Sequence, residues 1–309
     1  GVAEQWSRFS HVAAEHPFSW TTEPRSASEI ATENDQNRPI CFPYPKLMNP
    51  LISVDMGAAV LVAADGAVPH PPGRRPVYFL GGASTEDRQR FLVERSSFTS
   101  SPALGAAAER ALGAAGLDLS DVDCFDLYSC FPSAVAIAQR SHGLSRDDPR
   151  PLTLTGGLGF FGGPGNDYGL HAIATRAEAI ASGRHETGLG TGLGWFLHKH
   201  AAGVYGAEAS AAKSPALPES SIVGDPPVPV VDVVSGRGTI ETYTAFHSRD
   251  GEPTSAVIYG RTAEGHRFVA ASPKDPNQIA ALMDRCYVGR PVCLETDRST
   301  GRNEATLED

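Results

Sequence analysis

Two segments between residues 123 and 171 hold the side chains best suited to chemistry. In the first, an apolar stretch that begins after Asp123 leads to Tyr128 and Cys130 and then meets Pro132. The second contains a dense set of turn-forming residues: Gly156, Gly157, Gly162, Gly163, Pro164 and Gly165. Each segment passes from a strand through a turn into a helix, an arrangement that builds sites at the carboxyl ends of strands. We therefore expect chemistry there.

Tyr128 and His171 are the two candidates for proton transfer. The phenol of Tyr128, with an ordinary pKa of about 10, can donate to a substrate oxygen or act as an acid. His171 can supply an imidazole from the first turns of the next helix. The competing interpretations are structural: an aromatic ring that ends a buried strand, and a hydrogen-bonded core histidine. For Cys130 we expect a small core residue, because nothing nearby in the sequence would lower its pKa.

The glycine-rich segment is more than a tight turn. A structural turn explains two glycines, and it does not explain the five at 156, 157, 162, 163 and 165. Such density indicates left-handed backbone or a close approach of the backbone to a ligand. Amides at the start of the following helix can also stabilise negative charge on an oxygen. We therefore predict that residues 156–165 form a substrate or oxyanion loop.

Residues 198–200, His-Lys-His, form a weaker candidate site. On a strand the two histidines share one face and could bind zinc, but no third ligand has suitable spacing, so we expect no metal. Lys199 would point the other way, where it could contact an anionic phosphate. A solvated lysine is the alternative.

Hydrophobic periodicity predicts the elements that position these residues. Helices are expected over 2–15, 28–32, 102–115, 132–142 and 166–182, and strands over 53–64, 77–80, 122–127, 152–154, 187–192 and 201–206. The strand at 53–64 is almost entirely apolar, which predicts burial on both faces. Residues 81–100 are expected to be a long loop. Alternating helices and strands predict a layered α/β domain with largely parallel pairing.

A second, smaller domain follows a linker. Residues 207–229 are rich in Ala, Ser and Pro, as linkers are. Beyond them the apolar period changes to two, with hairpin turns at 249–252 and 264–265, a short helix at 276–283 and a strand at 288–294. These features predict a small β-barrel-like domain over 230–296. The polar residues 297–309 are expected to be disordered.

Composition excludes several classes of protein. A formal net charge of −10 and a pI near 5.5 argue against a nucleic-acid partner, which would require basic stripes. The five cysteines lack the spacing of a disulfide scaffold, so we expect free thiols and a cytoplasmic location. No apolar run is long enough to span a membrane, and no signal peptide is visible.

Several motifs together resemble the thiolase superfamily. Residues 53–61 (Ser-Val-Asp-Met-Gly-Ala-Ala-Val-Leu) are similar to the last strand of the family's N-terminal repeat, and residues 126–131 (Asp-Leu-Tyr-Ser-Cys-Phe) fall where thiolases carry N-E-A-F or H-D-C-F. Residues 156–165 correspond to the family's G-G…G-H-P-x-G loop, and 188–194 to its C-x-G loop. The resemblance covers residues 1–206, and residues 230–296 resemble the OB-like module of such proteins.

The resemblance implies a layered α-β-α thiolase core, mostly the C-terminal repeat, followed by a β-barrel-like domain. Residues 1–80 would end the first repeat and residues 81–206 would form the second. The implied activity is that of an acyl-CoA-binding acyltransferase of the acetyl-CoA C-acyltransferase type, with no tightly bound cofactor and a coenzyme A thioester as substrate. Lys199 would then contact CoA, and the protein would be a homodimer.

The departures from the family pattern keep other functions open. Tyr128 stands where thiolases have Asn or His, Gly163 stands in place of the loop histidine, and no cysteine occurs between residues 131 and 285. His171 could supply the missing imidazole. A retro-aldol lyase acting on a hydroxyacyl-CoA through Tyr128 would need no nucleophilic cysteine. A non-catalytic CoA-binding or scaffold subunit is the third alternative.

The resemblance also implies a partner segment. Thiolases have two repeats, and only the last strand of the first is recognisable, at residues 53–64. A lone apolar strand would expose unpaired edges. We therefore expect an N-terminal fragment of about two hundred residues carrying the first repeat, cleaved or separately encoded.

Overall fold

The chain forms two compact units. The computed structural model describes residues 1–69, 71–209, 220–272 and 275–308. The first unit contains Gly1–Ser28, Met48–Arg88 and Thr99–Gly224, and the second contains Glu29–Leu47, Gln89–Phe98 and Asp225–Asp309. The sequence-based division had placed residues 29–47 and 89–98 in the first unit. Residues 29–47 join the second because β1 (Pro39–Cys41) pairs with a strand of the barrel, and residues 89–98 join it because their 3₁₀ turn packs against another barrel strand, residues 267–271.

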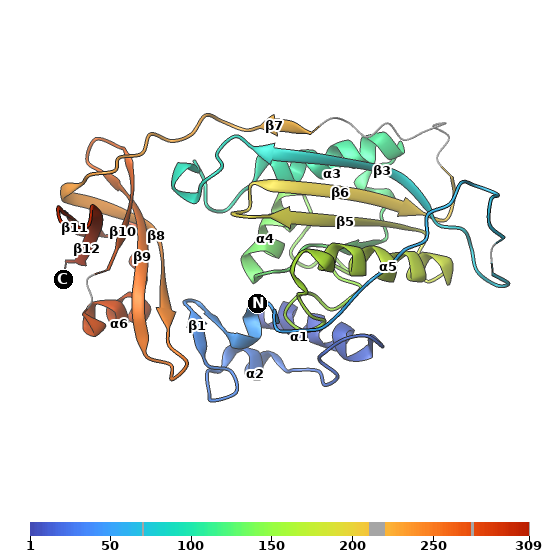
Figure 1. Cartoon of the computed structure of the whole chain (residues 1–309), viewed down its shortest axis with the longest axis horizontal. Helices are drawn as coiled ribbons and strands as arrows, with labels where there is room; N and C mark the ends of the chain where they lie inside the picture. The colour runs from blue at the N-terminus through green and yellow to red at the C-terminus, as the bar shows by residue number, and fades with distance from the viewer. Residues whose placement is uncertain (70, 210–219, 273–274, 309) are drawn as a thin grey trace. The chain divides into compact units, whose positions relative to one another are not determined.

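The first unit is built on a five-stranded sheet (Figure 1). Its strands lie in the order β4 (Cys124–Asp126), β5 (Thr187–Gly194), β6 (Lys199–Gly206), β3 (Tyr78–Asp87) and β7 (Ser221–Val223). The outer pairs are parallel, whereas β5–β6 and β6–β3 are antiparallel. The prediction of largely parallel pairing was therefore wrong at the centre, because a short turn returns the chain directly from β5 into β6.

Helices cover both faces of this sheet, which confirms the layered α-β-α architecture. Helix α3 (Pro102–Ala115) packs on β3 and β6, and α5 (Tyr168–Ala181) packs on β5 and β6. The glycines show that the two faces differ. A side chain at Gly81 would meet the backbone of α3, whereas one at Gly190 would meet Arg176 of α5. Strand register places Gly81 and Gly190 on opposite faces.

The remaining helices of the first unit follow the predicted stop and start signals. Ser101 caps α3 by accepting a bond from the Leu104 amide (3.3 Å), and Gly116 ends it in the left-handed region at φ 70°. Helices α1 (Val2–Glu15) and α4 (Pro132–Ser141) are also confirmed, as is the short α2 (Ala27–Ala31). The unit also contains the 3₁₀ turns Leu119–Asp121 and Gly165–Asp167. The turn Leu92–Glu94 belongs to the second unit, and Lys46–Met48 spans the change from the second unit to the first after Leu47.

Three predicted strand or loop assignments in the first unit were wrong. Residues 53–64 are extended but not in a sheet, and Leu61 and Val62 are 87% and 86% exposed, because none of the described strands pairs with them. The predicted strand at 152–154 is not formed, although Phe125 N donates to Pro151 O (2.8 Å) along the edge of β4. Residues 81–87, which were predicted to be part of a loop over 81–100, belong to β3 instead.

The second unit contains a closed five-stranded barrel. Its strands follow the order β8 (Ser235–His247), β9 (Pro253–Thr262), β10 (Arg267–Ala271), β12 (Arg302–Leu307) and β11 (Pro291–Asp297), and β11 pairs back onto β8. Helix α6 (Pro276–Asp284) connects β10 to β11, and β10 and β12 are parallel. This is the strand order of an OB fold. Strands β1 and β2 (Tyr44–Pro45) extend the sheet beyond β8.

The expectations for the linker and the tail need correction. Residues 302–307 form β12, with Asn303 and Ala305 buried, so most of the segment 297–309 is ordered. Their polar composition hid a strand whose partners are β11 and β10. Of the linker predicted at 207–229, residues 210–219 lie outside the described part, and Ser221–Val223 pair with β3 as β7.

Two expectations about covalent and membrane character can be compared with the structure. All five cysteines are free, as predicted. Within the described ranges, we find no helix with both the length and the apolar character that a membrane span requires.

Candidate functional site

A buried carboxylate organises the carboxyl end of β4. Asp126 is fully buried, and its Oδ2 accepts bonds from Thr153 Oγ1 (3.1 Å) and the Leu154 amide (2.9 Å). Its Oδ1 accepts a bond from the Tyr168 hydroxyl (2.9 Å). Asp126 therefore joins β4, the segment before the glycines and the first turn of α5. The sequence analysis missed this role, although an acidic residue ending a buried strand was the signal for it.

The first half of the glycine loop is shaped by packing. Gly156 and Gly157 have φ values of 102° and 81°, in the left-handed half of the map. A Cβ on Gly156 would lie 2.4 Å from that of Ala13 in α1, and one on Gly157 would lie 2.6 Å from Ser129 Oγ. These glycines are therefore needed because α1 and the turn after β4 lie against the loop.

Four glycine amides of this loop already have acceptors. Gly156 N donates to Thr153 Oγ1 (3.0 Å) and Gly157 N to Thr155 Oγ1 (3.1 Å). Gly163 N donates to the Leu51 carbonyl (2.9 Å), and Gly165 N to that of Gly163 (2.8 Å). An oxyanion would have to displace these partners, so the role of the loop in binding an oxyanion stays a prediction.

The remaining loop residues lie at its solvent side and against residues 51–56. Gly162 has φ 136°, and a Cβ there would lie 2.5 Å from Met56 Sδ. Pro164 is half-buried and precedes the 3₁₀ turn Gly165–Asp167, while Gly165 is exposed. The end of the loop thus leads directly into α5.

Tyr128 lies beside this network. Its amide donates to Thr191 Oγ1 (2.9 Å), and its ring packs edge-on against Tyr168 with ring centroids 5.6 Å apart. Burial raises the pKa of Tyr128, and burial raises the pKa of the neighbouring Cys130 thiol to about 11. At neutral pH both groups keep their protons, so Tyr128 is suited to donate a proton and Cys130 is a weak nucleophile.

His171 lines a cavity of about 1040 Å³ in the first unit. Its Nε2 lies 3.2 Å from Asp167 Oδ2, one turn earlier in the chain. The ring of Phe161 lies between His171 and a second imidazole, His16, with centroids 5.3 Å and 4.9 Å away. The structure therefore brings His16 and His171 to the lining of one cavity, and Asp167 lies close to His171.

His16 is the functional candidate that the sequence analysis missed. It follows the last residue of α1, and its Nε2 lies 3.1 Å from Thr175 Oγ1 of α5. Burial is the main cause that lowers the pKa of His16. Its neutral imidazole can exchange a proton with a ligand at physiological pH. Its position just after an amphipathic helix gave no sign of this role.

The predicted phosphate contact lies away from this cavity. Lys199 begins β6, and its Nζ lies 3.6 Å from Glu86 Oε1 on the neighbouring β3. It does not line the cavity that contains His171. His198 and His200 are both buried, and His200 contacts Ser101 Oγ through its Nε2 (3.0 Å).

Comparisons with known proteins agree on one group of relatives. A family model described as the thiolase-like protein type 1 additional C-terminal domain matches residues 217–299. Along 99% of its length the chain resembles a solved structure, a monomeric SCP2-thiolase like protein type 1 from Mycobacterium smegmatis, with 32% sequence identity and a TM-score of 0.81. The match covers 68% of that relative. A search among curated proteins finds no match.

Proposed function

The chain belongs to the SCP2-thiolase-like proteins of type 1, and from this premise we propose that it binds an acyl-CoA thioester and acts as an acyltransferase of the acetyl-CoA C-acyltransferase kind. The observation that carries the proposal is that His171 lines the cavity of about 1040 Å³ while its Nε2 lies 3.2 Å from Asp167 Oδ2. A histidine beside a carboxylate is a common general base. The CoA thioester is the substrate, and no tightly bound cofactor is proposed.

His171 would move the proton that this chemistry requires. Formation of a carbon–carbon bond beside a thioester begins with removal of a proton from the carbon next to the carbonyl. The imidazole of His171 accepts that proton, and Asp167 stabilises the imidazolium that results. The apolar part of the acyl group would lie against Met56 and Phe161, which line the same cavity.

A non-catalytic CoA-binding subunit is the second candidate function. Among the described residues that line the cavity there is no cysteine, and four loop amides are bonded within the protein. Both observations favour binding without an acyl-enzyme. A retro-aldol lyase that uses Tyr128 as its proton donor remains the third candidate, because the raised pKa of that phenol keeps it protonated.

The missing nucleophile would come from a partner segment. Residues 60–62, Val-Leu-Val, are extended, apolar and exposed, with Leu61 87% exposed. We propose that this stretch pairs with strands of a first thiolase repeat, which would carry the nucleophilic cysteine. Pairing would satisfy the free strand edges and bury the apolar side chains.

We propose a monomer in the cytoplasm rather than the homodimer that the superfamily resemblance implies. The solved relative is described as monomeric. Five free cysteines favour a reducing compartment. Sedimentation velocity measures the mass of the particle, and a dimer at micromolar concentration would refute the monomer.

Incubation of the intact protein with acetoacetyl-CoA and CoA tests the acyltransferase proposal. We expect acetyl-CoA to form, and His171→Gln to lower kcat by about 10²- to 10⁴-fold, as loss of a general base does. His11→Gln, at an exposed position of α1, is the matched control and should keep wild-type activity.

Calorimetry with CoA separates the alternatives. CoA binding without acetyl-CoA formation would leave the non-catalytic subunit. Cleavage of a 3-hydroxyacyl-CoA that is lost in Tyr128→Phe would establish the lyase. Absence of CoA binding to the intact protein would remove all three functions.

A further inference from the structure

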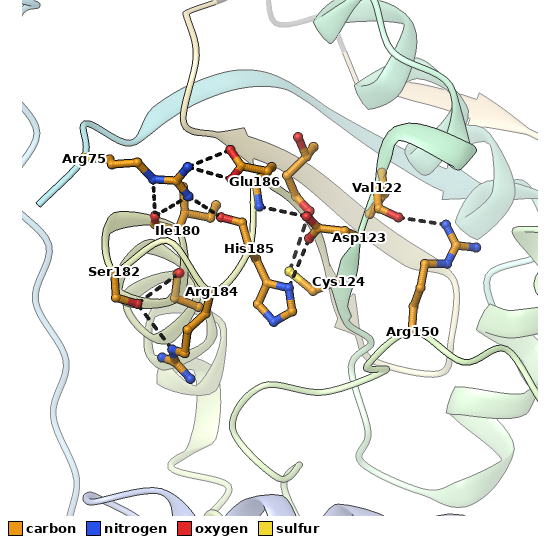
Figure 2. Close-up of polar contacts among 12 residues, drawn as sticks. Arg75, Val122, Asp123, Cys124, Arg150, Ile180, Ser182, Arg184, His185 and Glu186 are labelled. Atoms are coloured by element: carbon orange, nitrogen blue, oxygen red, sulfur yellow. Dashed lines mark hydrogen bonds and ion pairs between the residues drawn. The ribbon is translucent and has the colours of Figure 1, made fainter.

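Three potential metal ligands meet at the start of β4, at the opposite end of that strand from the glycine loop. Asp123, Cys124 and His185 come from the beginning of β4 and the connection between α5 and β5 (Figure 2). One ligand atom from each lies within 4.8 Å of the other two. This cluster is independent of the cavity that contains His171.

The geometry is close to that of a tetrahedral zinc site. Asp123 Oδ1 lies 3.2 Å from His185 Nδ1. Two oxygen or nitrogen ligands at about 2.0–2.1 Å from one zinc ion, at a tetrahedral angle, are about 3.3 Å apart. The thiol sulfur of Cys124 needs to approach by no more than about 1.2 Å, because it lies within 4.8 Å of the other two ligand atoms and a sulfur ligand at about 2.3 Å from zinc lies about 3.6 Å from the others.

The backbone around the cluster is held in place by other contacts. Asp123 Oδ2 accepts a bond from the Glu186 amide (2.7 Å), which fixes the carboxylate. The guanidinium of Arg75 donates to the His185 carbonyl (2.8 Å) and to that of Ile180 (3.0 Å). Figure 2 shows these contacts along the backbone from which the imidazole projects. The ligand-bearing segments are therefore preorganised.

The side-chain atoms that face the centre of the cluster are not committed elsewhere. Asp123 Oδ1 is buried, and it faces the other two members of the cluster, His185 Nδ1 at 3.2 Å and the thiol of Cys124. Cys124 is fully buried, and outside the cluster its Sγ makes a long contact, 3.7 Å, with the Thr187 carbonyl. An ion bound by the three side chains would therefore replace contacts within the cluster and leave the bonds to the rest of the fold in place.

We propose that Asp123, Cys124 and His185 bind one divalent transition-metal ion, with Zn²⁺ as the best match and water as the fourth ligand. A thiolate, an imidazole and a carboxylate form a mixed donor set that suits Zn²⁺ and does not suit Mg²⁺ or Ca²⁺. On binding, the thiol of Cys124 releases its proton to solvent and the metal–sulfur bond forms. The ion would fasten the start of β4 to the connection that leads into β5.

Titration of the intact, metal-free protein with Co²⁺ tests the site. Cobalt takes tetrahedral zinc sites, and a thiolate ligand gives a charge-transfer band in the near ultraviolet that oxygen and nitrogen ligands do not give. We expect this band to saturate at one equivalent and to disappear when Zn²⁺ is added. The band should weaken as the pH falls, because protons compete for the ligands.

Variants assign the ligands. Cys124→Ala should abolish the band, and His185→Gln should weaken metal binding at least 10-fold. Cys286→Ser, which removes an exposed thiol elsewhere, should leave the band unchanged. A wild-type protein that gives no band with stoichiometric Co²⁺, or a band that persists in Cys124→Ala, would overturn the proposal. Since the decisive measurement uses the wild type, a variant that fails to fold does not decide the result.

Discussion

The two ends of β4 use the same kind of side chain in opposite ways. Asp126 at its carboxyl end is fully buried, and both of its carboxylate oxygens accept hydrogen bonds. Asp123, just before its amino end, has one oxygen bonded to the Glu186 amide and one that faces His185 and Cys124. The carboxylate of Asp126, with both oxygens bonded to other parts of the fold, holds those parts together. The carboxylate of Asp123 keeps one oxygen facing the other potential metal ligands. Hydrogen-bond satisfaction therefore separates a structural acid from a candidate ligand.

Removal of each carboxylate in turn tests directly whether Asp126 contributes more to stability than Asp123. Asp126→Ala leaves the Tyr168 hydroxyl and the Leu154 amide buried without their acceptor, so we expect a loss of about 3–5 kcal/mol in unfolding free energy. Asp123→Ala in the metal-free protein removes a partly exposed pair and should cost about 1 kcal/mol. Urea denaturation followed by circular dichroism measures both. Equal losses would contradict the distinction.

Glycine substitutions test whether the loop beside Asp126 is fixed by packing. Gly156→Ala introduces a Cβ 2.4 Å from that of Ala13 at a position with φ 102°, so we expect a loss of about 3 kcal/mol. Gly165→Ala is the matched control, since its φ is 59° but no atom lies within 4 Å of the new Cβ. It should cost about 1 kcal/mol. The same denaturation experiment measures both, and a mild Gly156→Ala would show that α1 is loosely packed.

The hydroxyl of Tyr168 offers a smaller change within the same network. Tyr168→Phe removes the donor to Asp126 Oδ1 and the contact with Thr155 Oγ1 (2.8 Å), while the ring keeps its packing. We expect a loss of about 2 kcal/mol, typical of a hydrogen bond to a charged group. Tyr128→Phe should change stability by less than about 0.5 kcal/mol. If both variants lost the same amount, the network around Asp126 would not be the source of stability.

Local signals in the sequence were sufficient for elements that depend on neighbours in the chain. Ser101, Pro102 and Gly116 predicted the ends of α3, and the turns around Gly251 and Gly265 predicted the hairpins of the barrel. The family resemblance added the layered core and the OB-like domain. Both were confirmed by the structure and by its solved relative.

Features that depend on distant partners could not be predicted. The apolar residues 53–64 were expected to form a strand and do not, whereas the polar residues 302–307 were expected to be disordered and form one. Whether a stretch becomes a strand depends on its pairing partners more than on its composition. The sequence suggested that Gly156 contacts a ligand, but the structure shows that it is a glycine because Ala13 of α1 packs against it. Likewise, His185 lies far along the chain from Cys124, so no spacing motif revealed their cluster.

His142 offers a further test of this comparison. None of the described residues forms a hydrogen bond with its ring, yet it is not one of the three clustered ligands Asp123, Cys124 and His185. Both ring nitrogens of His142 are buried and bond to none of the described residues, and burial, with a smaller contribution from His200, lowers its pKa from 6.5 to about 4. Between these two pH values the unfolded chain binds a proton that the folded chain does not, so stability falls as the pH drops from about 6.5 to about 4. We expect this group to account for up to about 3 kcal/mol of the decrease by pH 4, measured by urea denaturation at several pH values. His142→Leu should flatten the profile in this window while the exposed His11→Gln leaves it unchanged; an unaltered profile in His142→Leu would show that the imidazole is hydrated or bonded in solution.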